Sequence, residues 1–338
     1  MPRCLQAPDQ VKPFRYVDNF ANGFTRRRRG TGWEYATLTG KRVTTPAVIE
    51  RLNAIALPPA YRDAWYCKSG SGHILATGVD DRGRRQYRYH PNFRARQEDY
   101  KYERCKAFAD ALPDIRARIE IDLARRDLSF ERVAAAVVRL LDLGKVRVGN
   151  QSYARANKSF GATTLKSRHV AVKGARLMLD YVGKSGKQQR ISLEDKRLVA
   201  LVKRCQDLPG QALFQYDRPG NDRREITSSD INDYLRDCCG GFTAKDFRTW
   251  GASVIAFGVL AETKGQLSLK MMLEAVAAQL GNTPAIARKS YVHPAIIEAA
   301  LEKSGDAKDW TLPRATQFLS RTERGFIAFV KRREQSGD

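Results

Sequence analysis

The chain has 338 residues, enough for two domains with separate cores, the second larger than the first. Sixty lysines and arginines against 37 acidic residues give a formal net charge of +23, which attracts polyanions and makes nucleic acid the expected partner. An acidic membrane surface is the weaker alternative, because the basic residues are spread along the chain and not gathered on one amphipathic helix.

Residues 1–96 mix short apolar runs with Gly, Pro and basic clusters, which predicts short strands joined by turns. The alternation in QYRYH places Tyr87 and Tyr89 on one face of a strand and Arg88 on the other. The two tyrosines therefore form either a contact platform or part of a core. The charge run Arg26–Arg29 is typical of a flexible, solvated loop, although in a DNA-binding protein it would add phosphate contacts.

Longer helical segments begin after Arg96 and define a second domain, residues 97–338. The first segment continues past Pro113. Ser129 can cap the next helix, SFERVAAAVVRLLDLG, which has an apolar stripe and Gly144 as its stop. Arg147 follows just beyond the end of that helix.

The middle of this domain predicts a hairpin and then a helix. The stretch ARLMLDYVGKSGKQQRISLED has two plausible strands around a turn, so Lys184 is expected at a hairpin tip. Further on, Thr243 can cap a helix that carries Lys245 and Arg248 three residues apart, on one face.

The last predicted helices surround a tyrosine. Thr283 and Pro284 have the character of a helix start, Tyr291 lies two turns later, and Pro294 opens the next helix. Together these elements predict an α+β chain with a small strand-rich N-terminal domain and a larger, mainly helical domain.

Several kinds of site are not expected. The six cysteines form no C-x-x-C pair and only four histidines are present, so a structural zinc site is not predicted. The chain shows no D-x-D or D-E-x-K carboxylate cluster and no G-x-x-x-x-G-K-[ST] motif. It also shows neither a secretory signal nor the roughly 18 apolar residues of a membrane helix. We therefore expect a soluble intracellular protein that needs no metal, ATP or other cofactor.

Four motifs occur in the order VRVGN, YVGKSGK, KDFRTWG and GNTPAIARKSYVHP. In this order they resemble the type IB DNA topoisomerases of the poxvirus-type and bacterial branch. The segments LPPAYRDAWYC, GHILATGVDDRGRRQYRYHP and NKSFGATTLKSRHV resemble the bacterial members, so the similarity spans nearly the whole chain. The resemblance implies a catalytic domain of the tyrosine recombinase and topoisomerase IB type, with a small hairpin sheet. It further implies a cytoplasmic, nucleoid-associated monomer that clamps duplex DNA between its two domains.

The resemblance also implies catalytic roles. Metal-free cleavage of a phosphodiester needs a nucleophile, cations around the phosphorus and an acid for the leaving oxygen. Arg147 and Arg248 match the arginines that hold the nonbridging oxygens, a task that suits a planar guanidinium group. Lys184 matches the hairpin lysine that protonates the 5′ oxygen, with Lys245 as a candidate assistant. Tyr291 matches the nucleophile, which forms a 3′-phosphotyrosyl link.

Asn282 departs from the poxvirus pattern, which has histidine in G-H-T-P where this chain has GNTP. An amide can donate a hydrogen bond to a phosphate oxygen but carries no proton charge. We expect neutral hydrogen bonding at this position, with a helix cap as the alternative. His293 is given no catalytic part.

The family's DNA contacts fall on two segments. Gln86, Tyr87 and Tyr89 match an N-terminal strand that touches the duplex, and Asn150 and Tyr153 follow Arg147 in a DNA-facing segment. Such contacts mostly position the DNA backbone.

Two other functions are weighed against the topoisomerase. A tyrosine recombinase or integrase shares the chemistry, but it usually has His-x-x-Arg where this chain has Lys245 to Arg248, and its N-terminal domain is helical. A catalytically inactive DNA-binding protein would bind DNA with steep salt dependence and never form a covalent adduct.

Overall fold

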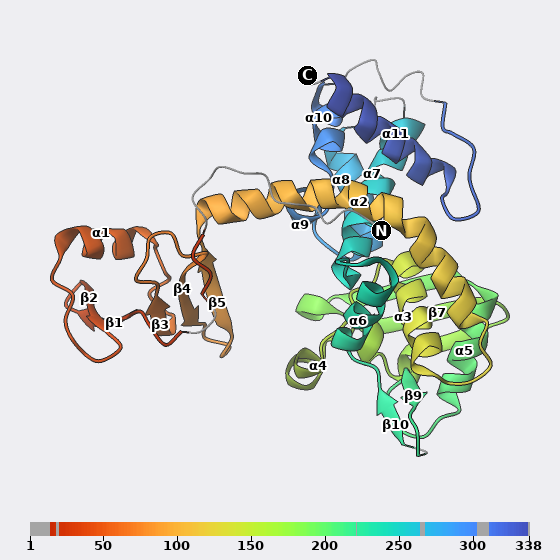
Figure 1. The fold of residues 1–338 in the computed structure, drawn as a ribbon, viewed down its shortest axis with the longest axis horizontal. Coiled ribbons are helices and arrows are strands. Elements are labelled where there is room, and N and C mark those ends of the chain that lie inside the picture. Colours follow the sequence, from red (N-terminus) through yellow and green to blue (C-terminus); the bar gives the residue numbers. More distant parts are fainter. Residues whose placement is uncertain (1–13, 18–19, 221, 264–267, 303–310, 337–338) are drawn as a thin grey trace. The chain divides into compact units, whose positions relative to one another are not determined.

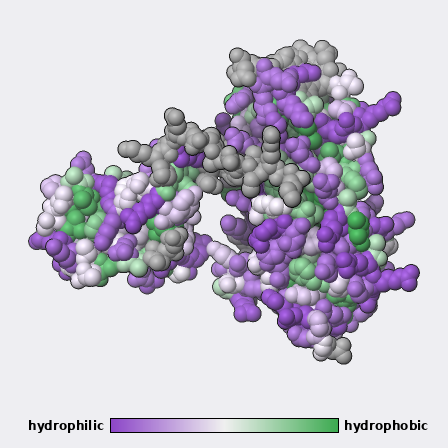
Figure 2. Space-filling view, viewed as in Figure 1, coloured by the Kyte–Doolittle hydropathy of each residue, from purple (hydrophilic) through white to green (hydrophobic). Residues whose placement is uncertain are grey.

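The computed structural model describes residues 14–17, 20–220, 222–263, 268–302 and 311–336. The chain divides into two compact units, Met1–Lys101 and Tyr102–Asp338 (Figure 1). The first unit is strand-rich, and the second is mainly helical with small sheets, which confirms the predicted α+β class. Figure 2 shows that the visible surface of each unit is largely hydrophilic, with small apolar areas between the polar side chains.

The N-terminal unit is built on one antiparallel sheet with the strand order β2-β1-β3-β4-β5. Its elements are β1 (Phe24–Arg29), β2 (Gly32–Thr37), α1 (Pro46–Ala54), β3 (Arg62–Tyr66), β4 (Ile74–Val79) and β5 (Arg85–Tyr89). Leu52 of α1 packs with Tyr35 and Tyr66 on one face of the sheet. Trp65 lies in a second cluster with Val17 and Phe20. The sequence did not predict α1.

The sequence predicted a loop for the run Arg26–Arg29, and this prediction is wrong. The run forms most of strand β1. Alternate arginines find partners on opposite faces of the sheet. Arg26 donates to the Leu57 carbonyl at 2.7 Å and stacks on Trp33, whereas Arg27 and Arg29 pair with Glu34. These contacts offset the mutual repulsion of the four charges, which is why a strand can form here.

The C-terminal unit consists mostly of helices. They are α2 (Pro91–Leu123), which starts in the first unit, α3 (Phe130–Gly144), α4 (Gln151–Asn157), α5 (Lys196–Gln206), α6 (Ser228–Cys239), α7 (Ala244–Glu262), α8 (Leu269–Leu280), α9 (Pro284–Ser290), α10 (Pro294–Glu302) and α11 (Arg321–Ser336). Helix α2 runs through Pro113 without ending. Helix α7 packs against α3, α6, α8, α10 and α11 and is the centre of the unit. Phe247 and Trp250 on α7 are buried in this core.

Two small sheets complete the described part of the unit. One has the strand order β6-β7-β8, from β6 (Val170–Lys173), β7 (Arg176–Val182) and β8 (Gln188–Glu194). The other pairs β9 (Gln215–Asp217) with β10 (Arg223–Glu225). The β7–β8 hairpin is the one predicted from the sequence, and its tip is the 3-10 turn Lys184–Gly186.

The end of α3 differs in detail from the expectation. Gly144 is still helical, and the left-handed residue that stops the helix is Lys145, at φ 52°. At the other end, Ser129 is the N-cap residue, but its hydroxyl donates to Asp127 and makes no cap hydrogen bond. The chain leaves α3 one residue later than predicted.

Candidate active site

Arg147 and Arg248 reach the site from the end of α3 and the start of α7, and these two helix ends are in contact. Lys145 turns the chain after α3, so that Arg147 lies just beyond the helix. The Lys145 carbonyl accepts a hydrogen bond from Nη1 of Arg248, in the second turn of α7. Gly251 leaves room for this approach, because a Cβ there would lie 2.5 Å from Cδ of Lys145. Helix α7 therefore positions the loop that carries Arg147.

Arg248 is 5% exposed, and most of its polar atoms have partners. Nη2 donates to the Leu280 carbonyl at 3.0 Å, while the buried Nε has no hydrogen-bond partner among the described residues. Burial lowers the pKa of Arg248, and the nearby charge of Arg147 lowers it further. Its guanidinium carbon lies 5.2 Å from the centre of the Tyr291 ring. Arg147 and Arg248 are neighbouring cations, and Nε of Arg248 is a donor without a partner among the described residues. Such a pair can bind an anion.

Asn282 joins this pair from the turn between α8 and α9. Its Oδ1 accepts a hydrogen bond from Nη2 of Arg147 at 2.6 Å. Because the oxygen end of the amide faces Arg147, Nδ2 points elsewhere, and it is buried with no partner in the part of the chain that the structure describes. The helix cap of α9 is Thr283, whose side chain accepts from the Ile286 amide. The capping alternative for Asn282 is therefore wrong.

Tyr291 ends α9 and is half-buried. Its amide donates to the Ala287 carbonyl at 3.1 Å, and its carbonyl accepts from the Ser253 hydroxyl of α7 at 3.2 Å. Burial alone would raise the pKa of Tyr291, but Arg248, then Arg147 and Lys184, outweigh it and hold the pKa below the usual 10. The three cations therefore act on the phenol together.

Lys184 lies exposed at the hairpin tip, where Ser185 and Gly186 have positive φ values of 64° and 74°. The hairpin touches the Asn282 turn through two other side chains. Nζ of Lys187 donates to the Asn282 carbonyl at 3.0 Å. A Cβ on Gly281 would lie 2.3 Å from Oε1 of Gln189, so Gly281 admits that side chain. These contacts place the hairpin that carries Lys184 at its tip beside the turn that carries Asn282.

Among the described residues, three predicted residues of this unit form no hydrogen bond or ion pair with the cluster. Lys245 is exposed although Arg248 on the same helix is buried, and no hydrogen bond or ion pair within the described ranges joins it to the other site residues. Asn150 caps α4 by accepting from the Tyr153 amide at 3.1 Å. The Tyr153 side chain is 51% exposed.

The predicted contact residues of the N-terminal unit lie on β5. Tyr87 and Tyr89 are 44% and 46% exposed and stack with their ring centres 6.1 Å apart, so they are not core residues. Arg88 points the other way and donates to the Ala56 carbonyl, which confirms the predicted alternation. Gln86 donates to Oδ2 of Asp80 at 2.9 Å, and this bond fixes the direction of its amide.

The sequence did not single out three residues at the site. They are Lys187, Ser253 and Tyr181, a buried phenol on β7. Burial raises the pKa of Tyr181 to about 12 although Arg248 and Arg147 oppose the rise, so it stays neutral. Of these three, only Lys187 could have been found from the sequence. It is the second lysine of YVGKSGK, and a hairpin tip exposes several side chains at once.

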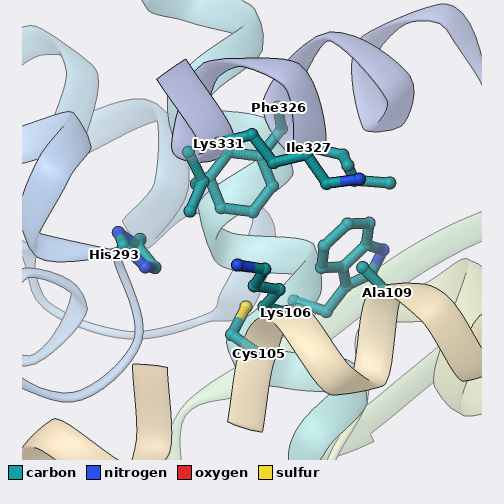
Figure 3. A pocket seen from close by; sticks show the side chains of 9 residues that line it. Cys105, Lys106, Ala109, His293, Phe326, Ile327 and Lys331 are labelled. Carbon is teal, nitrogen blue, oxygen red and sulfur yellow. The ribbon is translucent and has the colours of Figure 1, made fainter. Parts of the chain in front are cut away.

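His293, two residues after Tyr291, lines a small apolar pocket and does not belong to the cluster. Figure 3 shows its ring beside the pocket, together with Cys105 of α2 and Phe326 of α11. Its ring packs edge-on against Tyr102 at 5.1 Å and Phe326 at 5.8 Å between ring centres. Its role in the described structure is packing.

No described helix is long and apolar enough to cross a membrane. Within the same residues, no three His, Cys, Asp or Glu side chains gather as a metal-binding group.

Family models match most of the chain. The model of the eukaryotic DNA topoisomerase I catalytic core matches residues 90–316, and that of the bacterial DNA topoisomerase IB N-terminal domain matches residues 32–80. The DNA topoisomerase 1B of Acanthamoeba polyphaga mimivirus is 30% identical over 285 residues, which cover 80% of this chain and 85% of the viral protein. The Vaccinia virus (strain Copenhagen) DNA topoisomerase 1B is 20% identical over 258 residues, covering 72% and 77%.

Among solved structures, the XerH site-specific recombinase bound to its palindromic difH substrate is similar over 56% of this chain and 50% of that one, with a TM-score of 0.36 and 14% identity. The match of the catalytic-core model to more than half of the chain, together with the mimivirus relative, shows the family. The chain belongs to the type IB DNA topoisomerases, and it carries the N-terminal domain of their bacterial branch.

Proposed function

We propose that this protein relaxes supercoiled duplex DNA by cutting and resealing one strand through Tyr291. The observation that carries the proposal is the cluster of Arg147, Arg248 and Asn282 beside that phenol. Two of its buried donors, Nε of Arg248 and Nδ2 of Asn282, have no partner among the described residues. A nonbridging phosphate oxygen would satisfy them, because buried donors are rarely left without an acceptor.

In the proposed step the Tyr291 oxygen attacks the phosphorus and loses its proton to solvent. The bond between phosphorus and the 5′ oxygen breaks, and that oxygen takes a proton from Lys184. The products are a 3′-phosphotyrosyl link and a free 5′-hydroxyl. Resealing is the same exchange in reverse, so one ester bond replaces another and no fuel is needed.

The surrounding charges stabilise both ends of this reaction. Arg248, Arg147 and Lys184 lower the pKa of the Tyr291 phenol, so less free energy is needed to deprotonate it. The arginines and the Asn282 amide would bind the extra negative charge that develops at phosphorus. Lys245, which is exposed on the same helix as the buried Arg248, is the second candidate proton donor.

We propose that the protein acts as a monomer. In a recombinase, strand exchange takes place within a protein tetramer, and a segment after the tyrosine can pass to a neighbouring protomer. Here α11, which follows Tyr291, packs on α7 of its own chain through Phe326 against Trp250, 5.3 Å between ring centres. Glu323 of α11 also accepts from the Trp250 indole at 3.1 Å.

The two units would form a clamp around DNA, with Gln86, Tyr87 and Tyr89 touching the duplex from one and Asn150 and Tyr153 from the other. A bacterial protein with this substrate would work in the cytoplasm, in association with the nucleoid.

The deciding experiment mixes the protein with supercoiled plasmid in EDTA and then adds detergent. We expect relaxed plasmid, and DNA covalently attached to protein after denaturation. Tyr291→Phe should abolish both and retain DNA binding. A persistent adduct in this variant would assign the nucleophile to another residue, and binding without any adduct in the unmodified protein would favour an inactive DNA binder.

A concentration series separates the topoisomerase from a recombinase. Relaxation should stay proportional to protein at low concentration, where monomers prevail, and yield no recombined strands. A rate that rises with a higher power of the concentration, or strand exchange between two labelled duplexes, would contradict the proposal.

A further inference from the structure

Three arginines of the N-terminal unit converge on one carboxylate, and none of them belongs to the proposed catalytic or DNA-contact residues. Nε of Arg27 lies 2.5 Å from Oε1 of Glu34, Nη1 of Arg29 lies 2.9 Å from Oε2, and Nε of Arg42 lies 3.2 Å from Oε2. We call these four residues the arginine cluster. Arg27 stands opposite Glu34 in the β1–β2 register, and Arg42 continues the sheet through a bridge to Ala36.

The arginine cluster is an exposed, positively charged surface that is held together by the buried carboxylate of Glu34. The Glu34 side chain is 7% exposed, whereas those of Arg27, Arg29 and Arg42 are 77%, 61% and 57% exposed. One carboxylate cannot neutralise three guanidinium groups, so among the described residues two positive charges are left uncompensated at the surface. The hydrogen bond from Arg27 lowers the pKa of Glu34, which therefore stays ionised and keeps the arginines gathered.

The strand register places this cluster on a defined face. Arg26, the neighbour of Arg27, stands opposite Tyr35, which packs on α1. Side chains alternate along a strand, so Arg27 and Arg29 lie on the face away from α1.

The exposed tyrosines of β5 lie on that same face. Tyr87 pairs with Thr77, and Thr77 pairs with Trp65. Trp65 belongs to the cluster with Val17 and Phe20, whereas its neighbour Tyr66 packs with the α1 cluster. The α1-free face of the sheet therefore carries both the β5 tyrosines and the arginine cluster. Their strands, β5 and the β1–β2 pair, lie toward opposite edges of the sheet (Figure 1).

The distance across this face exceeds the width of the major groove of DNA. Five strands span four spacings, about 19 Å in all. The major groove is about 12 Å wide. A duplex that receives the β5 tyrosines in its groove would therefore bring phosphates that lie outside the groove toward the opposite edge of the same face.

We infer that the arginine cluster is a second phosphate-binding surface, which holds the backbone of the duplex whose groove faces Tyr87 and Tyr89. The inference rests on the proposed function for its substrate. Guanidinium groups bind phosphate through paired N–H donors, and contacts of this kind position DNA without reading its sequence. The cluster gives the N-terminal unit two separated points of attachment to one duplex.

The test measures binding of the full-length chain, with Tyr291→Phe to prevent cleavage, to a labelled linear duplex at several salt concentrations. Arg27→Ala combined with Arg29→Ala should weaken binding on the order of tenfold at low salt. It should also reduce the slope of log affinity against log salt by about one for each phosphate that the variant no longer binds. The weakening should be the same for duplexes of unrelated sequence.

Arg28 supplies the matched control, because it lies on the same strand but on the face of Trp33, its partner in β2. Arg28→Ala should leave affinity and salt slope close to those of the parent protein. Arg27→Lys combined with Arg29→Lys keeps the charges and should keep most of the slope. Thermal unfolding of each variant identifies any loss of folding. If the alanine pair unfolds, Arg42→Ala tests the inference, because Arg42 belongs to the same cluster and its loss should also reduce the salt slope.

Equal affinity and equal salt slope in the Arg27/Arg29 and Arg28 alanine variants would overturn the inference. That result would mean that the arginine cluster only stabilises the β1–β2 hairpin through its ion pairs. The proposed function would still stand if the unmodified protein relaxed plasmid and formed the adduct, so the two failures are distinguishable.

Discussion

Asn282 accepts a 2.6 Å hydrogen bond from Arg147 across 135 residues of sequence. The bond aligns the amide so that its oxygen meets the arginine and its nitrogen is buried without a partner in the described part of the chain. An arginine therefore orients a neutral donor toward the proposed phosphate position.

Asn282→Ala removes that donor, and we expect single-turnover cleavage to slow by on the order of a hundredfold, as for other single donors to a developing negative charge. Asn282→Asp should be slower still, because it replaces the donor with a negative charge. Both variants should bind DNA nearly as well as the parent chain. Cleavage within about threefold of the parent would show that the amide does not contact the phosphate in the reaction.

Changing the leaving group of the substrate distinguishes Lys184 from Lys245 as the proton donor. A substrate with sulfur in place of the bridging 5′ oxygen leaves as a thiolate, which needs no proton because thiols are far more acidic than alcohols. Lys184→Ala should cleave normal DNA slowly and recover on the sulfur substrate. Lys245→Ala should change either rate little, because Lys184, and not Lys245, is among the cations that lower the pKa of Tyr291. Recovery confined to the Lys245 variant would exchange the two assignments.

The pH dependence of cleavage should reflect the environment of Tyr291. Its pKa lies below 10, because Arg248, Arg147 and Lys184 together outweigh burial. A lowered pKa increases the phenolate fraction at any given pH, so the single-turnover rate should rise with pH and level off below pH 10. Arg147→Ala should move the midpoint upward, while Arg147→Lys, which keeps the charge, should move it less. A midpoint unaffected by the loss of that charge would contradict the assignment.

Glu323 should make the fold sensitive to acid. Burial would raise its pKa, but the hydrogen bond and charge of Arg116 lower it to about 2, from 4.5. A depressed pKa stabilises the fold above pH 4.5, and this contribution is lost as the pH falls toward 2. Glu323→Gln should lose on the order of 3 kcal/mol of unfolding free energy at pH 7. Chemical denaturation should show this difference shrinking between pH 4.5 and 2, and a constant difference would exclude the ionic origin.

Much of the C-terminal unit could be predicted, because its helices begin at N-cap residues that are recognisable in the sequence. Thr243 and Thr283 precede their helices as expected, and Lys184 lies at the tip of the predicted hairpin. Motif order also indicated Arg147, Arg248, Asn282 and Tyr291, which the structure brings together.

The remaining features depend on tertiary contacts that no local pattern contains. Arg26–Arg29 reads as a solvated loop until Glu34, Trp33 and the Leu57 carbonyl supply partners from other elements. Lys245 and Arg248 lie three residues apart on one helix, yet only Arg248 turns inward, because the carbonyls of Lys145 and Leu280 receive it. Their spacing predicted a common helix but could not tell which side chain would be buried.

Ser253 gives the tyrosine a mechanical anchor. Its hydroxyl lies 3.2 Å from the Tyr291 carbonyl and accepts from the His293 amide at 3.1 Å, so it fastens the main chain on both sides of Val292 to α7. In the proposed mechanism the phenol holds the 3′ end while the free 5′-hydroxyl end turns, so torque on the DNA would pull on the Tyr291 backbone, and this anchor would pass the load to the helix that also carries Arg248. The proposed catalytic groups would then keep their spacing until the strand is resealed.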